Sequence, residues 1–259
     1  MANTVKIKNT IIGEGVPKIC IPIIGKTKDE IINSAKELAD APHDLVEWRA
    51  DFFDDVFDFS KVSEVLAALR DFLGDTPLLF TFRSSNEGGE KSIDVQEYVE
   101  LNKAVILSNY ADLVDVELGM GDDILANLVE VAHLNDVKII ASNHDFEKTP
   151  SHDEMIFRLQ KMQDIGADIV KLAVMPTSKI DVLNLLAVTE EFKDRYAKVP
   201  IVTMSMASMG LISRISGEVF GSSITFGTVG KASAPGQMNA STLNQVLQSL
   251  HSSSENGLI

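Results

Sequence analysis

The chain of 259 residues contains a single cysteine, Cys20. One thiol cannot form a disulfide within the chain, which is typical of a reducing compartment, and it excludes cysteine-based zinc sites. No stretch approaches the roughly 18–20 consecutive apolar residues that span a bilayer, so no membrane contact is expected. The first residues, MANTVKIKNT, lack the continuous apolar core of a secretory signal. We therefore expect a cytoplasmic protein.

Basic residues are also scarce. The sequence has 23 lysines and arginines against 38 acidic residues, a net charge of −15. Nucleic acid binding requires clustered positive charge, so it is not expected here. The overall field would also repel any anionic ligand, and attraction of an anion would have to be built locally.

Short runs rich in valine and isoleucine alternate with amphipathic stretches along the whole chain. Eight runs are predicted to be buried strands, at 18–25, 45–51, 77–84, 113–118, 138–145, 169–176, 200–206 and 222–228. Helical periodicity follows each of them, at 28–40, 60–73, 94–107, 122–135, 152–166, 179–193, 208–216 and 239–250, with 208–216 the weakest.

Eight successive strand–helix pairs predict an α/β fold, a (β/α)₈ TIM barrel, in one domain over residues 1–259. An open doubly wound sheet is the alternative, but the turn GKTKDE after the first strand lacks its glycine pattern. Residues 1–16 are expected to form a β-hairpin that closes the bottom of the barrel. Residues 251–259 are polar and are expected to be a loose tail.

Charged residues occupy one face of several predicted strands. Side chains alternate between the two faces of a strand, and the uniformly apolar set suits the face that meets the helices. Six charges then point into the barrel: Glu47, Arg49, Arg83, Asp115, Glu117 and Lys171. Burying an ion costs several kcal/mol unless it is paired, so six charges are unlike the apolar side chains that normally pack the interior of a barrel. Structural ion pairs or a solvated sheet face are the alternative to our interpretation, an active site inside the barrel.

Lys171 is one candidate for chemistry. It lies between Val170 and Leu172, and burial with nearby arginines would favour a neutral amine that can form a Schiff base with a carbonyl. The alternative is an ion-pair lysine serving Glu47 or Asp115.

His144, in the segment SNHDF at the end of the fifth strand, is the second candidate, because a histidine there suits a general base. The alternative is a structural histidine. His43, His133, His152 and His251 are expected at the surface. A metal site at Asp115, Glu117 and His144 has little support, because the inward cations would compete for the carboxylates.

Residues after the last two strands complete the candidate site. Arg214 and the loop 230–237 lie where barrels bind anions. The loop has too few glycines for a phosphate cradle, so a carboxylate with hydroxyl groups is the better expectation. Arg214 as an ordinary surface residue is the alternative.

The same segments resemble type I 3-dehydroquinate dehydratases over about residues 17–250. The matching segments are EWRAD (47–51), FTFRSSNEGG (80–89), VDVEL (114–118), IIASNHDFEKTP (139–150), KMQDIGADIVKLAVMP (161–176), TMSMASMGLISRISGEVFGS (203–222) and KASAPGQ (231–237).

The resemblance implies a homodimeric TIM barrel of the shikimate pathway, part of aromatic amino acid biosynthesis, that converts 3-dehydroquinate to 3-dehydroshikimate without a metal or cofactor. By motif match Lys171 would be the Schiff-base lysine, His144 the proton-transfer residue and Glu87 its partner. The matching substrate contacts are Glu47, Arg49, Arg83, Arg214, Ser233 and Gln237. Two positions depart from the family pattern: Pro22 replaces a serine that touches substrate, and Phe52 a histidine found in some relatives. A Schiff-base aldolase and a non-catalytic anion-binding barrel are the rival interpretations.

Overall fold

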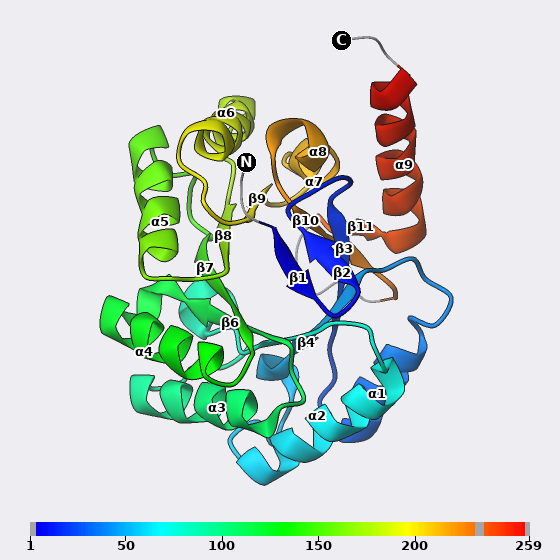
Figure 1. The fold of residues 1–259 in the computed structure, drawn as a ribbon, viewed down its shortest axis with the longest axis vertical. Helices are drawn as coiled ribbons and strands as arrows, with labels where there is room; N and C mark the ends of the chain where they lie inside the picture. The colour runs from blue at the N-terminus through cyan, green and yellow to red at the C-terminus, as the bar shows by residue number, and fades with distance from the viewer. Residues whose placement is uncertain (1–3, 231–235, 257–259) are drawn as a thin grey trace.

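The computed structural model describes residues 4–230 and 236–256. Eight parallel strands surround the centre (Figure 1), and from β3 to β9 each strand is hydrogen-bonded to the next along the chain. They are β3 (Lys18–Ile23), β4 (Leu45–Arg49), β5 (Leu78–Thr81), β6 (Leu113–Glu117), β7 (Lys138–Asp145), β8 (Ile169–Val174), β9 (Ile201–Ser205) and β10 (Ile224–Thr228). β10 pairs with β3, and Ser223 N, just before β10, donates to Ile201 O on β9 (2.8 Å), so the sheet closes. The predicted barrel is confirmed.

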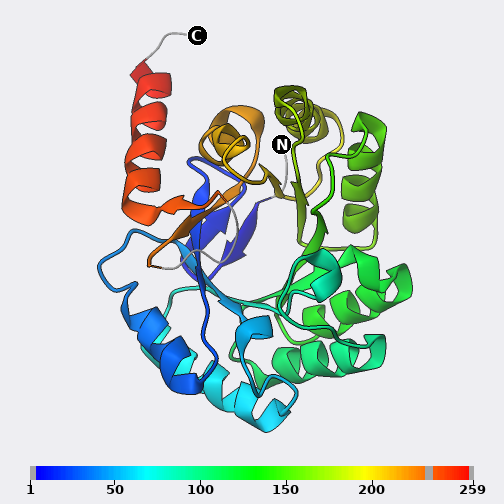
Figure 2. The same ribbon diagram turned by 180° about the vertical axis from the view of Figure 1, so that it is seen from behind.

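Helices cover the outside of the strands, as both views of the ribbon show (Figures 1 and 2). They are α1 (Lys28–Lys36), α2 (Phe59–Leu73), α3 (Val95–Ser108), α4 (Asp122–His133), α5 (His152–Asp164), α6 (Lys179–Arg195), α7 (Leu211–Ile215), α8 (Gly217–Phe220) and α9 (Ala240–Asn256). Three single turns of 3₁₀ helix follow β4, β5 and β6: η1 (Ala50–Phe52), η2 (Ser85–Glu87) and η3 (Leu118–Met120). A short strand, β11 (Met238–Asn239), adds to β10.

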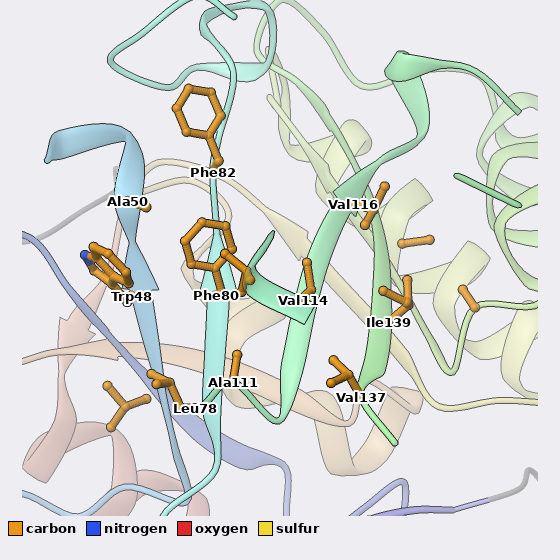
Figure 3. Packing of buried hydrophobic residues seen from close by; sticks show 14 of the residues in the cluster. Trp48, Ala50, Leu78, Phe80, Phe82, Ala111, Val114, Val116, Val137 and Ile139 are labelled. Carbon is orange, nitrogen blue, oxygen red and sulfur yellow. The ribbon is translucent and has the colours of Figure 1, made fainter. Parts of the chain in front are cut away.

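The apolar side chains of the strands form two layers. Trp48, Phe80, Val114 and Ile139 stand in register on neighbouring strands and pack under the helices (Figure 3). They are fully buried, as the alternation of the sequence predicts for the outward face.

The other apolar layer lies inside the barrel, at the amino ends of the strands. It is made of Leu45, Leu79, Leu113, Ile140, Ile169 and their neighbours. The antiparallel pair β1 (Val5–Ile7) and β2 (Thr10–Ile12) belongs to the same cluster through Val5, Ile7 and Ile12. The N-terminal hairpin therefore closes this end of the barrel, which confirms the prediction.

Two helical segments differ from the prediction. The stretch expected as one helix at 208–216 holds only the short helix α7, and a second short helix, α8, follows it. Its first residue is Gly217, where a Cβ would lie 2.6 Å from Ser222 O, so the position requires a glycine. The tail was expected to be loose from residue 251, but α9 continues to Asn256. His251 Nδ1 contacts Glu218 Oε1 (2.7 Å), and serine hydroxyls donate back to carbonyls of the preceding turn. Residues 257–259 lie outside the described residues.

Candidate active site

The six charges predicted to point inward are all buried at the carboxyl ends of the strands, each at most 8% exposed. β4 contributes Glu47 and Arg49, β6 contributes Asp115 and Glu117, and β8 contributes Lys171. Arg83 follows β5 by two residues. The parity argument from the sequence is therefore confirmed for all six.

A pocket enclosing about 610 Å³, part of it continuous with solvent, opens among these side chains. Its lining includes eight of the nine predicted site residues: Lys171, His144, Glu87, Glu47, Arg49, Arg83, Arg214 and Gln237. The ninth, Ser233, lies outside the described residues. Apolar side chains complete the wall: Phe146, Met204, Met206 and Phe226.

Lys171 extends from β8 into this pocket. Its Nζ lies 3.3 Å from Asp115 Oδ2 and 3.8 Å from Glu47 Oε1, and 4.6 Å from the centre of the Phe226 ring. The charged groups in contact with the amine are thus carboxylates, rather than the arginines that we expected. Lys171 therefore contacts both carboxylates of the alternative that the sequence left open, Asp115 and Glu47.

His144 and Glu87 form a hydrogen-bonded dyad at the pocket rim. His144 Nδ1 lies 2.8 Å from Glu87 Oε2, and the backbone N–H of His144 donates to the same oxygen (2.9 Å). Burial, and then the charges of Arg83, Lys171 and Arg49, hold the pKa of His144 well below its usual range. A neutral imidazole with one nitrogen bound to a carboxylate is suited to act as a base through the other nitrogen.

Glu87 experiences the opposite effect. Burial raises the pKa of this carboxyl to about 8; the Arg83 charge lowers it, and the Glu117 and Asp115 charges raise it. Because the two groups share a hydrogen bond, they titrate as a pair and bind their last proton together. When that proton is lost, an ionised Glu87 accepts from Nδ1–H, and Nε2 of His144 is free to accept a proton.

Arg83 is the centre of the buried ion network. Its Nη2 lies 2.8 Å from Asp115 Oδ1, and its Nη1 donates to Glu117 Oε1 (2.8 Å) and to Ser142 Oγ (3.0 Å). Burial alone would lower the pKa of Arg83, but the two carboxylates raise it well above its usual value. Likewise, burial would raise the pKa of Asp115, but Arg83 and Lys171 bring it below its usual value. Arg83 and Asp115 therefore stabilise each other's charged form.

Arg49 is held by a residue whose part in the site the sequence analysis missed. Its Nε and Nη2 donate to the two oxygens of Asp51, both at 2.8 Å, in a bidentate pair. Asp51 is completely buried in η1 and also accepts the backbone N–H of Glu90 (3.1 Å). The motif EWRAD thus contains its own orienting carboxylate, and the spacing of two residues between Arg49 and Asp51 is the signal that could have found it.

Arg214, on α7, is 2% exposed and is not the surface residue of the alternative interpretation. Its Nη1 lies 3.9 Å from Met204 Sδ, and burial lowers the pKa of Arg214 to about 10. A carboxylate placed against this guanidinium would compensate for the lost solvation. Gln237, which directly precedes β11, lines the same pocket.

The other four histidines lie outside this pocket. His133, His152 and His251 pair with carboxylates of Asp168, Glu191 and Glu218. In the part of the chain that the structure describes, no group of three or more histidine, cysteine or acidic side chains could hold a metal ion. No helix in the described ranges is long and apolar enough to cross a membrane.

A family model for type I 3-dehydroquinase matches residues 19–254. The chain belongs to the type I 3-dehydroquinase family. The 3-dehydroquinate dehydratase of Clostridioides difficile is 53% identical over 253 residues, which are 98% of this chain and 99% of that protein. A 3-dehydroquinate dehydratase of Salmonella typhimurium is 48% identical over 96% of this chain and 98% of its own length.

Solved structures of type I 3-dehydroquinases agree with the fold. The enzyme from Clostridium difficile with covalent modified comenic acid has a TM-score of 0.95 and 53% identity, covering 98% of this chain and all of that one. The 3-dehydroquinate dehydratase of Geobacillus kaustophilus has a TM-score of 0.94 and 37% identity, covering 97% and 98%. Membership of the family confirms the predicted class, a hydro-lyase.

The two positions that depart from the expected pattern, Pro22 and Phe52, lie next to residues of the site. Pro22 is buried in β3, in register with Glu47. Phe52 belongs to η1, and the guanidinium carbon of Arg49 lies 5.3 Å from the centre of its ring. Both positions contribute carbon to the surroundings of Arg49 and Glu47.

Proposed function

We propose that the chain dehydrates 3-dehydroquinate to 3-dehydroshikimate through a Schiff base on Lys171, with His144 as the general acid and base. The observation that carries the proposal is the shared pocket. In a member of the type I 3-dehydroquinase family, one buried amine and one neutral histidine line the same cavity. A relative with covalent modified comenic acid supports covalent chemistry in this family.

The first step forms the covalent intermediate. Lys171 gives one proton to a neighbouring carboxylate, its amine adds to the ketone carbon, and that proton returns to the departing hydroxyl, so that one water leaves and an iminium with a C=N⁺ bond to Nζ forms. The iminium carries the same single positive charge as the ammonium that it replaces. Asp115 and Glu47 therefore remain suitable counter-ions, and the ring of Phe226 favours a cation at this position.

The second step is the elimination. His144 removes the proton from the carbon next to the iminium, and the electron pair enters the C–N system as an enamine. The histidine, now cationic and stabilised by an ionised Glu87, returns the proton to the departing hydroxyl, which leaves as water. A second water hydrolyses the conjugated iminium and frees Lys171. Because the iminium is the electron sink, these steps require no metal or organic cofactor.

Binding and orientation of the substrate fall to the other predicted residues. We assign the substrate carboxylate to Arg214. Ser233 and Gln237, which follow β10 in the sequence, are assigned as further partners of the carboxylate and its neighbouring hydroxyl groups. Glu47, Arg49 and Arg83 are assigned to the hydroxyl side. Fixing the ring in this way would present one proton to His144, a positioning effect.

Borohydride reduction in the presence of 3-dehydroquinate tests the Schiff base directly. The wild type should acquire one adduct on Lys171, detected by mass spectrometry, and the absorbance of the conjugated product should rise when borohydride is omitted. Lys171→Met is the control and should show neither. An adduct without absorbance would favour an aldolase, and neither signal in the wild type would favour an anion-binding barrel.

We further propose that the protein is a homodimer, folds as one domain over residues 1–259 and resides in the cytoplasm. Its single cysteine, which is buried, and the family support these assignments.

Light scattering coupled to gel filtration should give twice the chain mass, and calorimetry should show one transition. Cell fractionation should recover the protein with cytoplasmic markers. A monomer mass, two transitions or a membrane fraction would each contradict the corresponding assignment.

A further inference from the structure

The hydrogen bonds of Glu87 continue beyond the pocket to the helix layer. Asn143 Nδ2 donates to Glu87 Oε1 (3.1 Å), and Asn143 Oδ1 accepts from Arg158 Nη1 on α5 (2.8 Å). Asn143 is in register with Leu172 on β8, whose side chain packs in the outer layer, so its side chain starts on the helix-facing side of β7. A three-residue chain, Arg158–Asn143–Glu87, therefore joins the outside of the barrel to His144.

The direction of each hydrogen bond in this chain is fixed by chemistry. A guanidinium has only donors, so the amide oxygen of Asn143 must face Arg158. The amide nitrogen must then face Glu87, and Glu87 Oε1 must accept. Its other oxygen already accepts from the backbone N–H of His144. Both oxygens thus have donors, which is the arrangement that suits an ionised carboxylate.

We propose that Arg158, which does not line the pocket, is a positioning residue that makes Glu87 an acceptor through Asn143 and so leaves Nε2 of His144 without its proton. The inference rests on the proposed function in so far as His144 is the base of the reaction. Without the guanidinium, nothing holds the amide nitrogen of Asn143 on Glu87 Oε1, so Asn143 can turn away and that oxygen loses its donor. A protonated Glu87 would then be favoured, donating to Nδ1 and leaving the proton of His144 on Nε2.

Arg158 is itself held in place. Its Nε donates to Glu154 Oε1 on the same helix (2.8 Å), and its Nη1 lies 3.7 Å from Asp145 on β7. The side chain is 22% exposed, so a substitution there does not open the core.

Several other charges face the dyad and act on the same proton. They are Arg83 after β5, Asp115 and Glu117 on β6, Lys171 on β8 and Arg49 on β4. Arg158 itself contacts Glu154, Asn143 and Asp145, so we expect these charges to stay in place when it is changed. A variant of Arg158 therefore changes one end of the Arg158–Asn143–Glu87 hydrogen-bond chain, while the other charges that act on the dyad stay the same.

Arg158→Met keeps the aliphatic stem and removes every donor. Lys161→Met is the matched control, because Lys161 lies on the same helix and loses a comparable ion pair, with Asp122 (2.8 Å). Two readouts apply: the tautomer of His144 from ¹⁵N shifts in the ligand-free protein, recorded above about pH 8, where the wild-type dyad has lost its proton, and the pH dependence of kcat/KM. Arg158→Met should move the proton of His144 from Nδ1 toward Nε2. It should also shift the rise of kcat/KM to higher pH and lower it about tenfold at pH 7, the size of loss seen for outer hydrogen-bond partners elsewhere.

Two further variants test whether Arg158 acts through Asn143. Arg158→Lys retains a donor-only cation and should restore most of the wild-type pH profile. In an Asn143→Ala background, Arg158→Met should have no further effect. Full additivity of the two substitutions, or a tautomer and pH profile in Arg158→Met equal to those of Lys161→Met, would overturn the inference. A wild type that does not dehydrate 3-dehydroquinate would instead overturn the proposed function, since the tautomer readout needs no substrate.

Discussion

Glu87 is a buried acid whose ionisation the fold opposes, and this has a measurable consequence for stability. In the unfolded chain a glutamate loses its proton near pH 4.5, whereas burial raises the pKa of Glu87 in the folded protein to about 8. Between these values the folded state holds a proton that the unfolded state has released. The free energy of unfolding therefore falls as the pH rises through this window, and the contribution of the neutral acid is complete only below pH 4.5.

The magnitude follows from the width of the window. Each pH unit corresponds to about 1.4 kcal/mol, so from pH 5 to pH 8 the wild type should lose roughly 4 kcal/mol relative to a variant without this acid. Glu87→Gln is that variant, because it keeps the size of the side chain and cannot ionise. The side chain is only 7% exposed, so little of the effect is screened by solvent.

Urea unfolding at fixed protein concentration, at pH 5, 6, 7 and 8, measures the effect. The stability of Glu87→Gln relative to the wild type should increase steadily over this range. Glu64→Gln on α2 is the control, because it removes a carboxylate that is 65% exposed. Its free energy of unfolding should stay within about a few tenths of a kcal/mol of the wild-type value at each of the four pH values. A constant difference between Glu87→Gln and the wild type would refute the raised pKa. A difference that falls with pH would show that the donors around Glu87 outweigh its burial.

Four other outcomes test the mechanism. In the wild type, kcat/KM should rise with pH and level off above about pH 8, because the dyad must lose its proton before His144 can act as a base; a profile that is flat from pH 6 to 9 would contradict this. Lys171→Ala should fold, as judged by circular dichroism, yet show no turnover, and wild-type turnover would refute its role. His144→Ala should still be trapped by borohydride but release product very slowly, and release at the normal rate would exclude it as the base. Arg214→Met should raise KM about 10- to 100-fold in steady-state assays with kcat less affected, the cost of one charge-assisted contact, and an unchanged KM would place the carboxylate elsewhere.

The strands and the inward charges were predictable because strand alternation leaves little freedom. Once Trp48 and Val114 are assigned to the helix-facing side, Glu47 and Asp115 must point inward, whatever the rest of the chain does. Eight such strands in succession then leave a closed barrel as the natural arrangement. Local pattern thus sufficed for the frame of the site and for most of its lining.

The orienting partners could not be predicted in this way. Asn143 has the outward parity, and it reaches Glu87 only because η2 brings that residue over the end of β7. The path of the loop after β5 depends on tertiary contacts such as the bond from Glu90 N to Asp51, and no periodicity in the sequence encodes them. The prediction of a loose tail after residue 250 was wrong for a related reason. Its polar composition gives no sign of the tertiary contact between His251 and Glu218.

The charge of the pocket also requires a different account from the one that the sequence suggested. Four cations among only 23 were expected to attract an anion against a net charge of −15. In the folded chain, three of them already have buried carboxylate partners: Arg49 with Asp51, Arg83 with Asp115 and Glu117, and Lys171 with Asp115 and Glu47. The pocket is therefore no strongly positive funnel that concentrates anions from a distance. The proposed recognition of a carboxylate therefore rests on short-range, directional contact at Arg214, which is 2% exposed and whose pKa burial lowers to about 10.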